Sequence, residues 1–466
     1  MHGRTHTVVL GGSLAGLLAA AAAARSTDRV TLVESDDPPT GPDPRKGVPQ
    51  ARHTHLLWSG GARVIESLLP GVTQRWLDAG ARRIGIPDGL VSLSARGWMR
   101  RWPQMQFLLT CSRDLLDWVV RERVLEIGNV TLRQGVRAEE LLGDGTRVTG
   151  ARLRERATGD VRDCPADLVV DATGRGSRAT AWLASLGLPP VPEETVDSGL
   201  TYATRVFRAP DGIPADFPVV NVQADPHAGC PGQTATLLPV EGGRWLVTLS
   251  GTRGGEPTTD PERFVPFARA VRHPVVGDLI AGAEPLGPVR GSRSTVNRRR
   301  FFERLPRWPE GFVVTGDAVA TYNPVYGHGM SVAAWGAAAL RNGLANGLAR
   351  QGHAAGTAYG IQRAIARTVD GAWATATTQD VLYPEARGDQ PGFSGRLMGH
   401  YVNRLMAASG SRPAAAEALF RAFTLSGPMT ALAGPKAVFA TLLGPYGQVS
   451  DRPPFNETEL RAIAGG

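Results

Sequence analysis

The fold is decided by the stretch Val8-Val9-Leu10-Gly11-Gly12-Ser13-Leu14-Ala15-Gly16, close to the N-terminus. Residues 8–10 form a short apolar run that suits a buried parallel strand, and residues 14–24 are alanine-rich and have high helix propensity. The glycines between them allow a tight turn and leave the first backbone N–H groups of the helix open to a phosphate group. The stretch therefore predicts a strand, a phosphate-binding turn and a helix.

A second strand and an acidic residue complete a dinucleotide-binding pattern. Residues 30–33 read as the next parallel strand and lead into Glu34, whose carboxylate can accept hydrogen bonds from both ribose hydroxyls of an adenosine. In the pattern G-x-G-x-x-G a small serine, Ser13, replaces the middle glycine. A lone glycine-rich turn is often purely structural, but a strand, helix, strand and acid in register favour a ligand site. The cofactor-binding residues expected here are Gly11, Gly12, Ser13, Leu14, Ala15, Gly16 and Glu34.

Composition limits the class of protein. A chain of 466 residues exceeds one ordinary core, which predicts two interlocked domains and an appendage. No segment approaches the ~20 apolar residues of a membrane span, and the N-terminus lacks the pattern of a signal peptide, so we expect a cytoplasmic protein without a membrane span. The three cysteines are widely spaced and indicate neither a disulfide framework nor a thiolate metal site.

The formal net charge is +8, carried almost entirely by arginine. Such a charge favours an acidic carrier protein or a substrate carboxylate as partner, although a GC-rich genome explains it equally well. The arginines are dispersed and no nucleic-acid-binding signature is present, so we expect no nucleic acid partner. The run Arg298-Arg299-Arg300 is expected to be a solvated basic edge.

Basic residues and histidines follow the ribose-binding strand. Arg45 and Arg52 are placed to pair with the phosphates of a cofactor. His53 and His55 alternate as metal ligands on a strand would, but no third ligand candidate stands near them. We therefore expect no metal, and histidines that are hydrogen-bonded near the cofactor or in the core.

Two later segments repeat the pattern of a buried strand that ends at a small or acidic residue. Asp167-Leu168-Val169-Val170-Asp171 leads into Ala172-Thr173-Gly174, and Phe312-Val313-Val314-Thr315 leads into Gly316-Asp317. The second of these continues into a glycine-lined start of an alanine-rich helix at about Ser331. Two separate glycine-lined helix starts imply a cofactor long enough to reach both, and FAD has that length.

The predicted fold is α/β (α+β overall), with a Rossmann-like FAD-binding domain interleaved with a β-sheet substrate domain and followed by a C-terminal helical cap. Ser112 is expected to cap a helix over residues 113–127. The predicted boundaries are 1–85, 106–190 and 295–375 for the discontinuous FAD-binding domain, 86–105 and 191–294 for the substrate domain, and 376–466 for the helical region.

The three segments 11–16, 171–177 and 316–330, in this order and spacing, resemble those of the flavoprotein monooxygenases of the para-hydroxybenzoate hydroxylase type. The similarity covers roughly residues 5–375. It implies that Asp317 bonds the ribityl chain of FAD, and the preceding Gly316 is also expected among the cofactor-binding residues. It also implies that Gly327, Gly329 and Met330 place backbone N–H groups near N1 and the C2 carbonyl of the flavin, where the reduced ring carries negative charge.

A closer resemblance, to the flavin-dependent epoxidases of ionophore polyether biosynthesis of the lasalocid and monensin type, covers most of the chain. Its motifs are Arg45-Lys46-Gly47-Val48-Pro49-Gln50-Ala51-Arg52-His53, Leu57-Trp58-Ser59-Gly60-Gly61-Ala62-Arg63, Ser250-Gly251-Thr252-Arg253-Gly254-Gly255, Ser292-Arg293-Ser294-Thr295-Val296-Asn297-Arg298-Arg299 and Asn323-Pro324-Val325-Tyr326-Gly327-His328-Gly329-Met330. The resemblance implies a polyene polyketide substrate, free or bound to a carrier protein, which is epoxidised by FAD and molecular oxygen through a C4a-hydroperoxyflavin. Electrons would come from NAD(P)H, directly or through a flavin reductase.

Related families refine the site. Glu34, Arg113, Asp317 and Met330 occupy positions like those that hold FAD in squalene epoxidase, and we add Val136 to the cofactor-binding residues. The aromatic hydroxylases carry an Asp-Gly pair where this chain has Ala172-Thr173-Gly174, which leaves open whether NADPH is used directly. Flavin halogenases would show a tryptophan-x-tryptophan-x-x-isoleucine-proline stretch, and the tryptophans here have the wrong spacing.

The chemistry expected of an epoxidase needs few titratable groups. The π electrons of an alkene attack the activated oxygen, so no deprotonated substrate, catalytic triad or essential cysteine is required. We expect mainly apolar walls that exclude water, with Pro324, His328 and Gly329 as the catalytic candidates around the oxygen. The alternatives are an FAD-dependent hydroxylase of an aromatic or aliphatic natural product, in which a phenol would profit from a general base, and a reductase or a non-catalytic flavin-binding protein.

Overall fold

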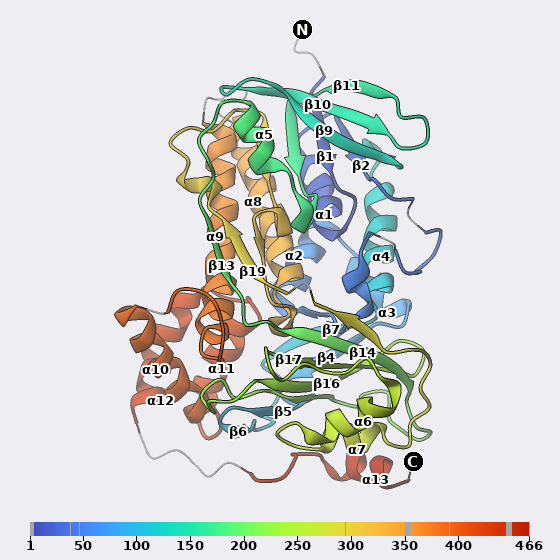
Figure 1. Cartoon of the computed structure of the whole chain (residues 1–466), viewed down its shortest axis with the longest axis vertical. Helices are drawn as coiled ribbons and strands as arrows, with labels where there is room; N and C mark the ends of the chain where they lie inside the picture. Colours follow the sequence, from blue (N-terminus) through green and yellow to red (C-terminus); the bar gives the residue numbers. More distant parts are fainter. Residues whose placement is uncertain are drawn as a thin grey trace.

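The computed structural model describes residues 4–37, 39–45, 47–293, 295–349, 356–390, 392–443 and 450–465. Figure 1 shows a sheet and its helices in the upper half of the molecule, a second large sheet below them, and a group of C-terminal helices at the lower left. Lys46 and Ser294, which belong to the motifs quoted above, lie outside the described residues. The mixed α/β fold class predicted from the sequence is confirmed.

The N-terminal stretch forms the centre of a parallel sheet of five strands. The strand order is β20 (Phe312–Val314), β12 (Leu168–Asp171), β1 (His6–Leu10), β2 (Arg29–Val33) and β8 (Val130–Arg133). Every residue of β1 is buried, because parallel sheets are covered on both faces, and this is why the strand reads as one apolar run. The carboxyl ends of β1, β2, β12 and β20 therefore meet at one edge, where the site is built.

Small residues allow the helices to pack closely over this sheet. α1 (Leu14–Ala23) is buried along almost its whole length and lies against α4 (Arg113–Leu125) and α8 (Gly329–Ala349), and α8 lies against α2 (Ser59–Leu68) and α9 (Thr357–Asp380). The predicted cap of α4 is confirmed, since the Ser112 side chain accepts a hydrogen bond from the Leu115 N–H. The remaining elements of the upper half are α3 (Val72–Asp78), α5 (Ala179–Ser185), β9 (Val136–Gly143), β10 (Val148–Glu155) and β11 (Val161–Pro165).

The lower half is built on a sheet of seven strands, called the large sheet below. Its order is β18 (Arg290–Ser292), β14 (Thr201–Arg208), β17 (Arg244–Gly251), β16 (Gln233–Val240), β15 (Val219–Val222), β5 (Leu90–Ser94) and β6 (Gly97–Trp98). One face packs on α6 (Pro261–Ala270) and α7 (Val275–Ile280) and is apolar. The opposite face points toward the site.

Two small sheets connect the halves. One has the order β3 (Leu56–Trp58), β7 (Gln106–Thr110) and β4 (Arg82–Ile86), and the other β13 (Glu193–Val196), β19 (Asn297–Arg300) and β21 (Ala320–Thr321). The prediction of a solvated basic edge at residues 298–300 is wrong, because Arg299 and Arg300 are buried in β19. Arg300 pairs with Glu193 at 3.1 Å, and Arg299 pairs with Glu303 at 3.0 Å and with Asp370 at 2.7 Å, so acidic side chains balance the two buried charges of the run.

The C-terminal region is helical, as predicted, but its last helix lies apart from the others. α10 (Phe393–Ser409), α11 (Pro413–Phe423) and α12 (Pro435–Leu442) form a small cluster with its own core. α13 (Glu457–Gly465) instead lies below the large sheet (Figure 1), where Arg101 pairs with Glu459 at 2.6 Å. Within the described part of the chain, no helix is long and apolar enough to cross a membrane.

Candidate functional site

A continuous cavity of about 1550 Å³ runs from the N-terminal glycine turn to the C-terminal helices. Most of the residues expected at the site line it, and they are Gly11, Gly12, Ser13, Leu14, Ala15, Glu34, Arg45, Arg113, Val136, Asp317, Pro324, Gly327, His328, Gly329 and Met330. Gly16, Arg52 and Gly316 are not part of its wall. The part along the glycine turn, Glu34 and Asp317 is called the groove below, and the part between the large sheet and the C-terminal helices is called the chamber.

The glycines of the turn are required by close backbone approach. Gly11 has φ +97°, and a Cβ there would lie 2.5 Å from the Ala172 carbonyl oxygen. A Cβ at Gly16 would lie 1.7 Å from the Gly11 carbonyl oxygen, so only glycine allows the start of α1 to pack against the turn. Gly16 is not part of the cavity wall. Ser13 precedes α1 without a side-chain capping bond. The first N–H groups of α1 are therefore left for an anion, which suits a pyrophosphate.

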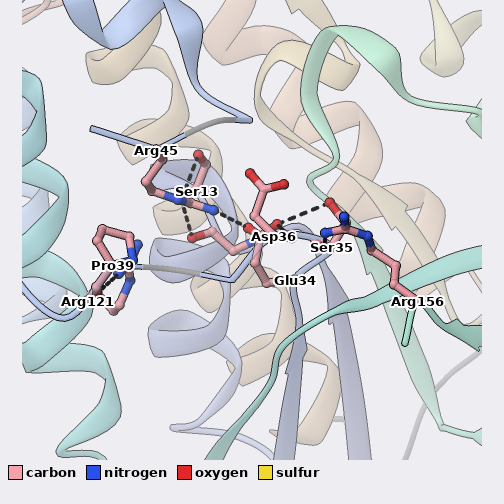
Figure 2. Close-up of polar contacts among 9 residues, drawn as sticks. Ser13, Glu34, Ser35, Asp36, Pro39, Arg45, Arg121 and Arg156 are labelled. Carbon is pink, nitrogen blue, oxygen red and sulfur yellow. Dashed lines mark hydrogen bonds and ion pairs between the residues drawn. The ribbon is translucent and has the colours of Figure 1, made fainter. Parts of the chain in front are cut away.

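Glu34 is the centre of a buried polar cluster at the end of β2 (Figure 2). Its Oε2 accepts hydrogen bonds from the Gly12 N–H at 2.9 Å and from Arg45 Nη2 at 2.6 Å. Its Oε1 accepts from the Asp36 N–H at 2.9 Å and from the Ser35 hydroxyl at 3.3 Å. Burial raises the pKa of Glu34, but the Asp36 N–H and the Arg45 charge outweigh burial and hold the pKa below its ordinary value. The carboxylate is therefore ionised at neutral pH.

Arg45 lies across the glycine turn. In addition to its ion pair with Glu34, its Nη1 donates to the Gly12 carbonyl oxygen at 3.2 Å and to the Ser13 hydroxyl at 3.4 Å. A carboxylate has about four acceptor positions, and each of those on Glu34 is used by a protein donor. A ribose hydroxyl bound to Glu34 would therefore replace one of these donors. The Arg45 side chain can move and the Ser35 hydroxyl can rotate away, whereas the Gly12 and Asp36 N–H groups belong to the backbone.

Asp317 brings the third segment to the groove. Gly316 has φ +64°, and a Cβ there would lie 2.7 Å from the Ala15 Cβ, so the turn after β20 packs directly on the start of α1. The Asp317 side chain is exposed to the cavity, and its carboxylate has no hydrogen bond to another described residue. Arg113, which also lines the cavity, is buried and pairs with Asp117 at 2.7 Å. An acceptor free for ligand hydroxyls thus lies beside the start of α1.

Residues 323–330 comprise a loop and the first two residues of α8, and they are called the 323–330 loop below. Gly327 has φ +65°, and a Cβ there would lie 3.0 Å from Leu56 Cδ1, so the left-handed turn fits tightly against β3. Trp58 Nε1 donates to the Tyr326 carbonyl oxygen at 3.3 Å and fixes the loop from the same strand. No acidic residue stands in the first turn of α8, which leaves the positive end of its dipole for a ligand.

Asp380, at the C-terminal end of α9, anchors this loop and was not predicted as a site residue. Its buried carboxylate accepts hydrogen bonds from Tyr326 OH at 2.7 Å, Asn297 Nδ2 at 2.7 Å and Asn323 Nδ2 at 3.0 Å. Tyr202 of the large sheet donates from its hydroxyl to Asn323 Oδ1 at 2.6 Å. Burial raises the pKa of Asp380, against the effect of these donors. The network ties the loop to α9, β19 and β14, and no local motif in the sequence marks it.

His328 is buried and neutral. Its Nε2 donates to the Phe423 carbonyl oxygen at 2.9 Å, which fixes the tautomer and leaves Nδ1 as an acceptor without a partner among the described residues. Burial lowers the pKa of His328 to about 4. The ring stands edge-on to Phe423, with centroids 5.3 Å apart, so α11 covers it. At neutral pH His328 can accept a hydrogen bond but is a weak base.

His53 and His55 are hydrogen-bonded side chains at the wall of the cavity, as expected. His53 Nδ1 lies 2.8 Å from the Thr204 hydroxyl, and His55 Nδ1 lies 2.8 Å from the His53 carbonyl oxygen. Burial lowers the pKa of His53 to about 4 and that of His55 to about 3. Within the described ranges no cluster of three or more His, Cys, Asp or Glu side chains is arranged to hold a metal ion.

The chamber is lined by the C-terminal helices, by the large sheet and by α9, which contributes Arg367 and Asp370, and the first two of these walls differ in character. The C-terminal helices contribute an apolar wall that contains Met398, Val402, Met406, Leu419, Phe420, Phe423, Met429 and Leu432. The large sheet contributes hydroxyl and amide side chains, among them Thr236, Thr248 and Asn221. The expectation of mainly apolar walls therefore describes the helical side, whereas the sheet side is polar.

Comparison with known proteins agrees with this geometry. The chain matches the family model of FAD dependent oxidoreductases over residues 7–184. Protein Rv3254 of Mycobacterium tuberculosis is 32% identical over 433 residues, which cover 91% of this chain and 90% of that protein. The chain belongs to the FAD-dependent oxidoreductase family.

Solved structures place the fold of this oxidoreductase among flavin-dependent monooxygenases and halogenases. The flavin-dependent brominase Bmp2 matches with a TM-score of 0.63 and 16% identity, over 90% of this chain and 94% of that chain. PqsL, a probable FAD-dependent monooxygenase from Pseudomonas aeruginosa, matches with a TM-score of 0.60 and 18% identity, over 81% of this chain and 97% of that chain. At such identities the likeness shows the fold alone.

The groove of the oxidoreductase fits FAD. The open N–H groups at the start of α1 suit the pyrophosphate, Glu34 suits the adenosine ribose, and Asp317 offers acceptors to the ribityl chain. The start of α8 at Gly329 suits the electron-rich edge of the flavin ring. Arg52, which was expected to pair with a phosphate, is exposed and lies outside the cavity wall.

Proposed function

We propose that this oxidoreductase is a monooxygenase that epoxidises carbon–carbon double bonds of a polyene polyketide, a precursor of a polyether. It would use FAD and molecular oxygen, with electrons from NAD(P)H directly or through a separate flavin reductase. Bound FAD supplies the activated oxygen, and the chain binds the substrate, orients its double bond and excludes water. The polyketide would reach the chamber free or on a carrier protein.

The observation that carries this proposal is the apolar wall of the chamber, together with three buried histidines beside it that are poor bases at neutral pH. His53, His55 and His328 have pKa values lowered to about 4, 3 and 4, so none is matched to proton abstraction at neutral pH. Hydroxylation of a phenol profits from a base that is matched to this task, whereas oxygen transfer to an alkene does not. The apolar helices offer the hydrocarbon chain a dry surface.

His328 and Pro324 belong to the 323–330 loop and line the end of the chamber. The lone pair on His328 Nδ1 can accept a hydrogen bond from a protonated oxygen and hold that proton without removing it. The buried Cys111 has a pKa raised by burial, so its thiol stays protonated and takes no part. Residues of the chain thus position groups and do not form covalent bonds.

The test is a set of incubations with linear polyenes, reduced flavin and ¹⁸O₂, analysed by mass spectrometry. Epoxidation adds one labelled oxygen atom per reacted double bond and leaves no new hydroxyl. An added hydroxyl on an intact ring or alkyl position would instead support the hydroxylase alternative, and flavin oxidation without any labelled product would contradict a monooxygenase.

A further inference from the structure

The large sheet carries a band of neutral polar side chains, most of which line the chamber, whereas Thr204 is buried with its hydroxyl 2.8 Å from His53 Nδ1. Thr204, Thr248, Thr236, Asn221 and Ser92 stand directly opposite one another in register across β14, β17, β16, β15 and β5. Adjacent strands are about 4.8 Å apart, so this row spans about 19 Å. We call it the first row. It crosses the strands at right angles and so joins segments that are far apart in the sequence.

A second row lies beside the first. Each of its members is two residues away from the member of the first row on the same strand. Tyr202, Ser250 and Thr234 pair directly in register, and Gln223 and Ser94 follow Asn221 and Ser92 by two positions. On the other side of the first row the side chains become apolar again, with Leu246 opposite Leu238 and Val219 opposite Leu90. Leu90 and Val219 also line the cavity, so the polar band borders an apolar strip on the same wall.

The band is hydrogen-bonded within itself and carries no charged side chain. Thr248 Oγ1 lies 2.7 Å from Thr204 Oγ1, and the Thr236 hydroxyl donates to Asn221 Oδ1 at 3.1 Å. Hydroxyl and amide groups both donate and accept, and hydroxyls rotate to suit a partner. Such a surface suits neutral oxygen groups of a ligand. A carboxylate or an ammonium group would find no counter-ion there.

The opposite wall sets the second requirement on the ligand. Met398, Met406, Phe420 and Met429 approach from α10, α11 and the turn after α11, and they offer only apolar surface to the chamber. A pure hydrocarbon would suit these residues but would cover those donors and acceptors of the polar band that its internal hydrogen bonds leave unused, at a cost for each of them. A ligand with one oxygen-bearing edge and one hydrocarbon edge satisfies both walls.

We propose that the two rows form a binding track for neutral hydroxyl, carbonyl or ether groups carried along one edge of an extended substrate chain. The hydrocarbon edge, with its double bonds, lies on the C-terminal helices. Tyr202, at one end of the second row, donates to Asn323 of the 323–330 loop, so the track leads to the proposed reaction centre. This inference rests on the proposed function and narrows its substrate to uncharged, oxygenated chains.

The experiment measures binding to the FAD-loaded enzyme by titration calorimetry, with saturated probes that have no double bond to oxidise. The probes are dodecane-1,5,9-triol, whose hydroxyls recur at about the strand spacing, dodecan-1-ol and dodecanoic acid. The triol is expected to bind at least about tenfold more tightly than the other two, because it replaces several hydrogen bonds of water. Thr236→Val and Asn221→Leu should each weaken the triol about five- to tenfold and leave dodecan-1-ol within about twofold.

Two further variants serve as controls. Thr131→Val removes an exposed hydroxyl from β8, outside the cavity wall, and should change the affinity for none of the probes. Met406→Ser alters the apolar wall and should weaken the triol and dodecan-1-ol alike. The track would be overturned if the triol bound no more tightly than dodecan-1-ol, if the acid bound most tightly, or if the triol showed no saturable binding. An unchanged affinity for the triol in both sheet variants would overturn it as well. Because no probe can be epoxidised, these results are independent of the oxygen-transfer experiment.

Discussion

The groove and the chamber belong to one cavity, yet they are made in opposite ways. The groove is built from backbone groups and a few side chains that follow the strands of one parallel sheet, and Glu34 lies only two dozen residues from the glycine turn in the sequence. The chamber takes its walls from several strands of the large sheet and from helices near the C-terminus. The difference teaches that a local stretch is enough to define a cofactor site, whereas a substrate site depends on register between distant segments.

Charge separates the two regions as well. In the groove, Glu34 and Arg45 form a buried ion pair at 2.6 Å, and Arg113 and Asp317 are close by. The large sheet and helices α10 and α11 contribute no charged residue to the described lining of the chamber, and its charged lining residues Arg367 and Asp370 come from α9. FAD carries phosphates and hydroxyls, which charged groups recognise, and a hydrocarbon chain does not. Each region therefore matches the chemistry of a different ligand.

The largest expected effect comes from a substitution in the groove that does not alter the chamber. Glu34→Ala would leave the Arg45 guanidinium buried without its carboxylate, because the Arg45 side chain is only 5% exposed. Breaking such a pair costs about 3–5 kcal/mol of unfolding free energy. The affinity for FAD should also fall, by about 1.5–3 kcal/mol if the carboxylate binds the ribose. Denaturant unfolding and FAD titration measure the two effects separately.

The double variant Glu34→Ala/Arg45→Ala is the matched control for this prediction. It removes both charges and should recover part of the stability that Glu34→Ala loses, because no unpaired buried cation remains. FAD affinity should stay low in the double variant. An unchanged affinity for FAD in Glu34→Ala would contradict the assignment of the ribose to this carboxylate.

A pH experiment probes the chamber end of the cavity. His328 has a pKa of about 4 in the folded protein and about 6.5 when unfolded, so the unfolded chain binds the extra proton first. Its contribution to stability is complete above pH 6.5 and is lost as the pH falls toward 4. Relative to His328→Asn, the parent should lose on the order of 3 kcal/mol over this interval. Equal pH profiles for the two proteins would show that His328 is not buried and neutral.

The groove and the chamber also differ in how far the sequence predicted them. The strand, turn and helix at residues 8–24 and the acid at Glu34 were predicted because their signal is local. Asp380 was missed, because its partners Asn297 and Asn323 lie far away in the sequence and meet it only through packing. Residues 298–300 were misjudged for the same reason. Glu193 and Asp370, which pair with Arg300 and Arg299, lie far from them in the sequence, and a run of arginines alone gives no sign of burial.

The strands that carry the polar band have a recognisable pattern in the sequence. Hydroxyl or amide residues alternate with apolar ones in Ser92 and Ser94, Asn221 and Gln223, and Thr234 and Thr236. This period of two places one polar face and one apolar face on each strand. Strand identity was therefore predictable from the sequence. The pairing of those faces into rows was not, because register is set by turns and partners across the sheet.

A smaller effect tests the contact between the two regions. Asp380→Asn would place an amide among the amide donors of Asn297 and Asn323, and would remove a charged acceptor from Tyr326. We expect a loss of about 2 kcal/mol in unfolding free energy. If the loop positions the reacting groups, the ratio of oxygenated product to released peroxide should also fall in enzyme that retains FAD.

The control for Asp380→Asn comes from the same helix. Asp370→Asn changes a carboxyl whose side chain is 60% exposed and which pairs with Arg299 at 2.7 Å. Such a pair contributes little, so stability should change by less than about 1 kcal/mol and the product-to-peroxide ratio should not change. If both variants changed that ratio equally, a specific positioning role for Asp380 would have to be abandoned.

The smallest expected effect is that of replacing Arg52, which the sequence analysis placed beside the cofactor phosphates together with Arg45. Arg45 lies over the glycine turn and is buried, whereas Arg52 is exposed and outside the cavity wall, although both belong to the same basic stretch. Arg52→Ala should change stability and FAD affinity by no more than about 0.5 kcal/mol, as is usual for an exposed site. Arg45→Ala, measured beside it, should weaken FAD, because it removes the cation nearest the expected pyrophosphate and leaves Glu34 without its partner. FAD titrations at two salt concentrations sharpen the comparison, since screening acts more strongly on exposed charges than on buried ones. If Arg52→Ala weakened FAD as much as Arg45→Ala did, the phosphates would have to extend toward residue 52, and the groove could not have the limits described above.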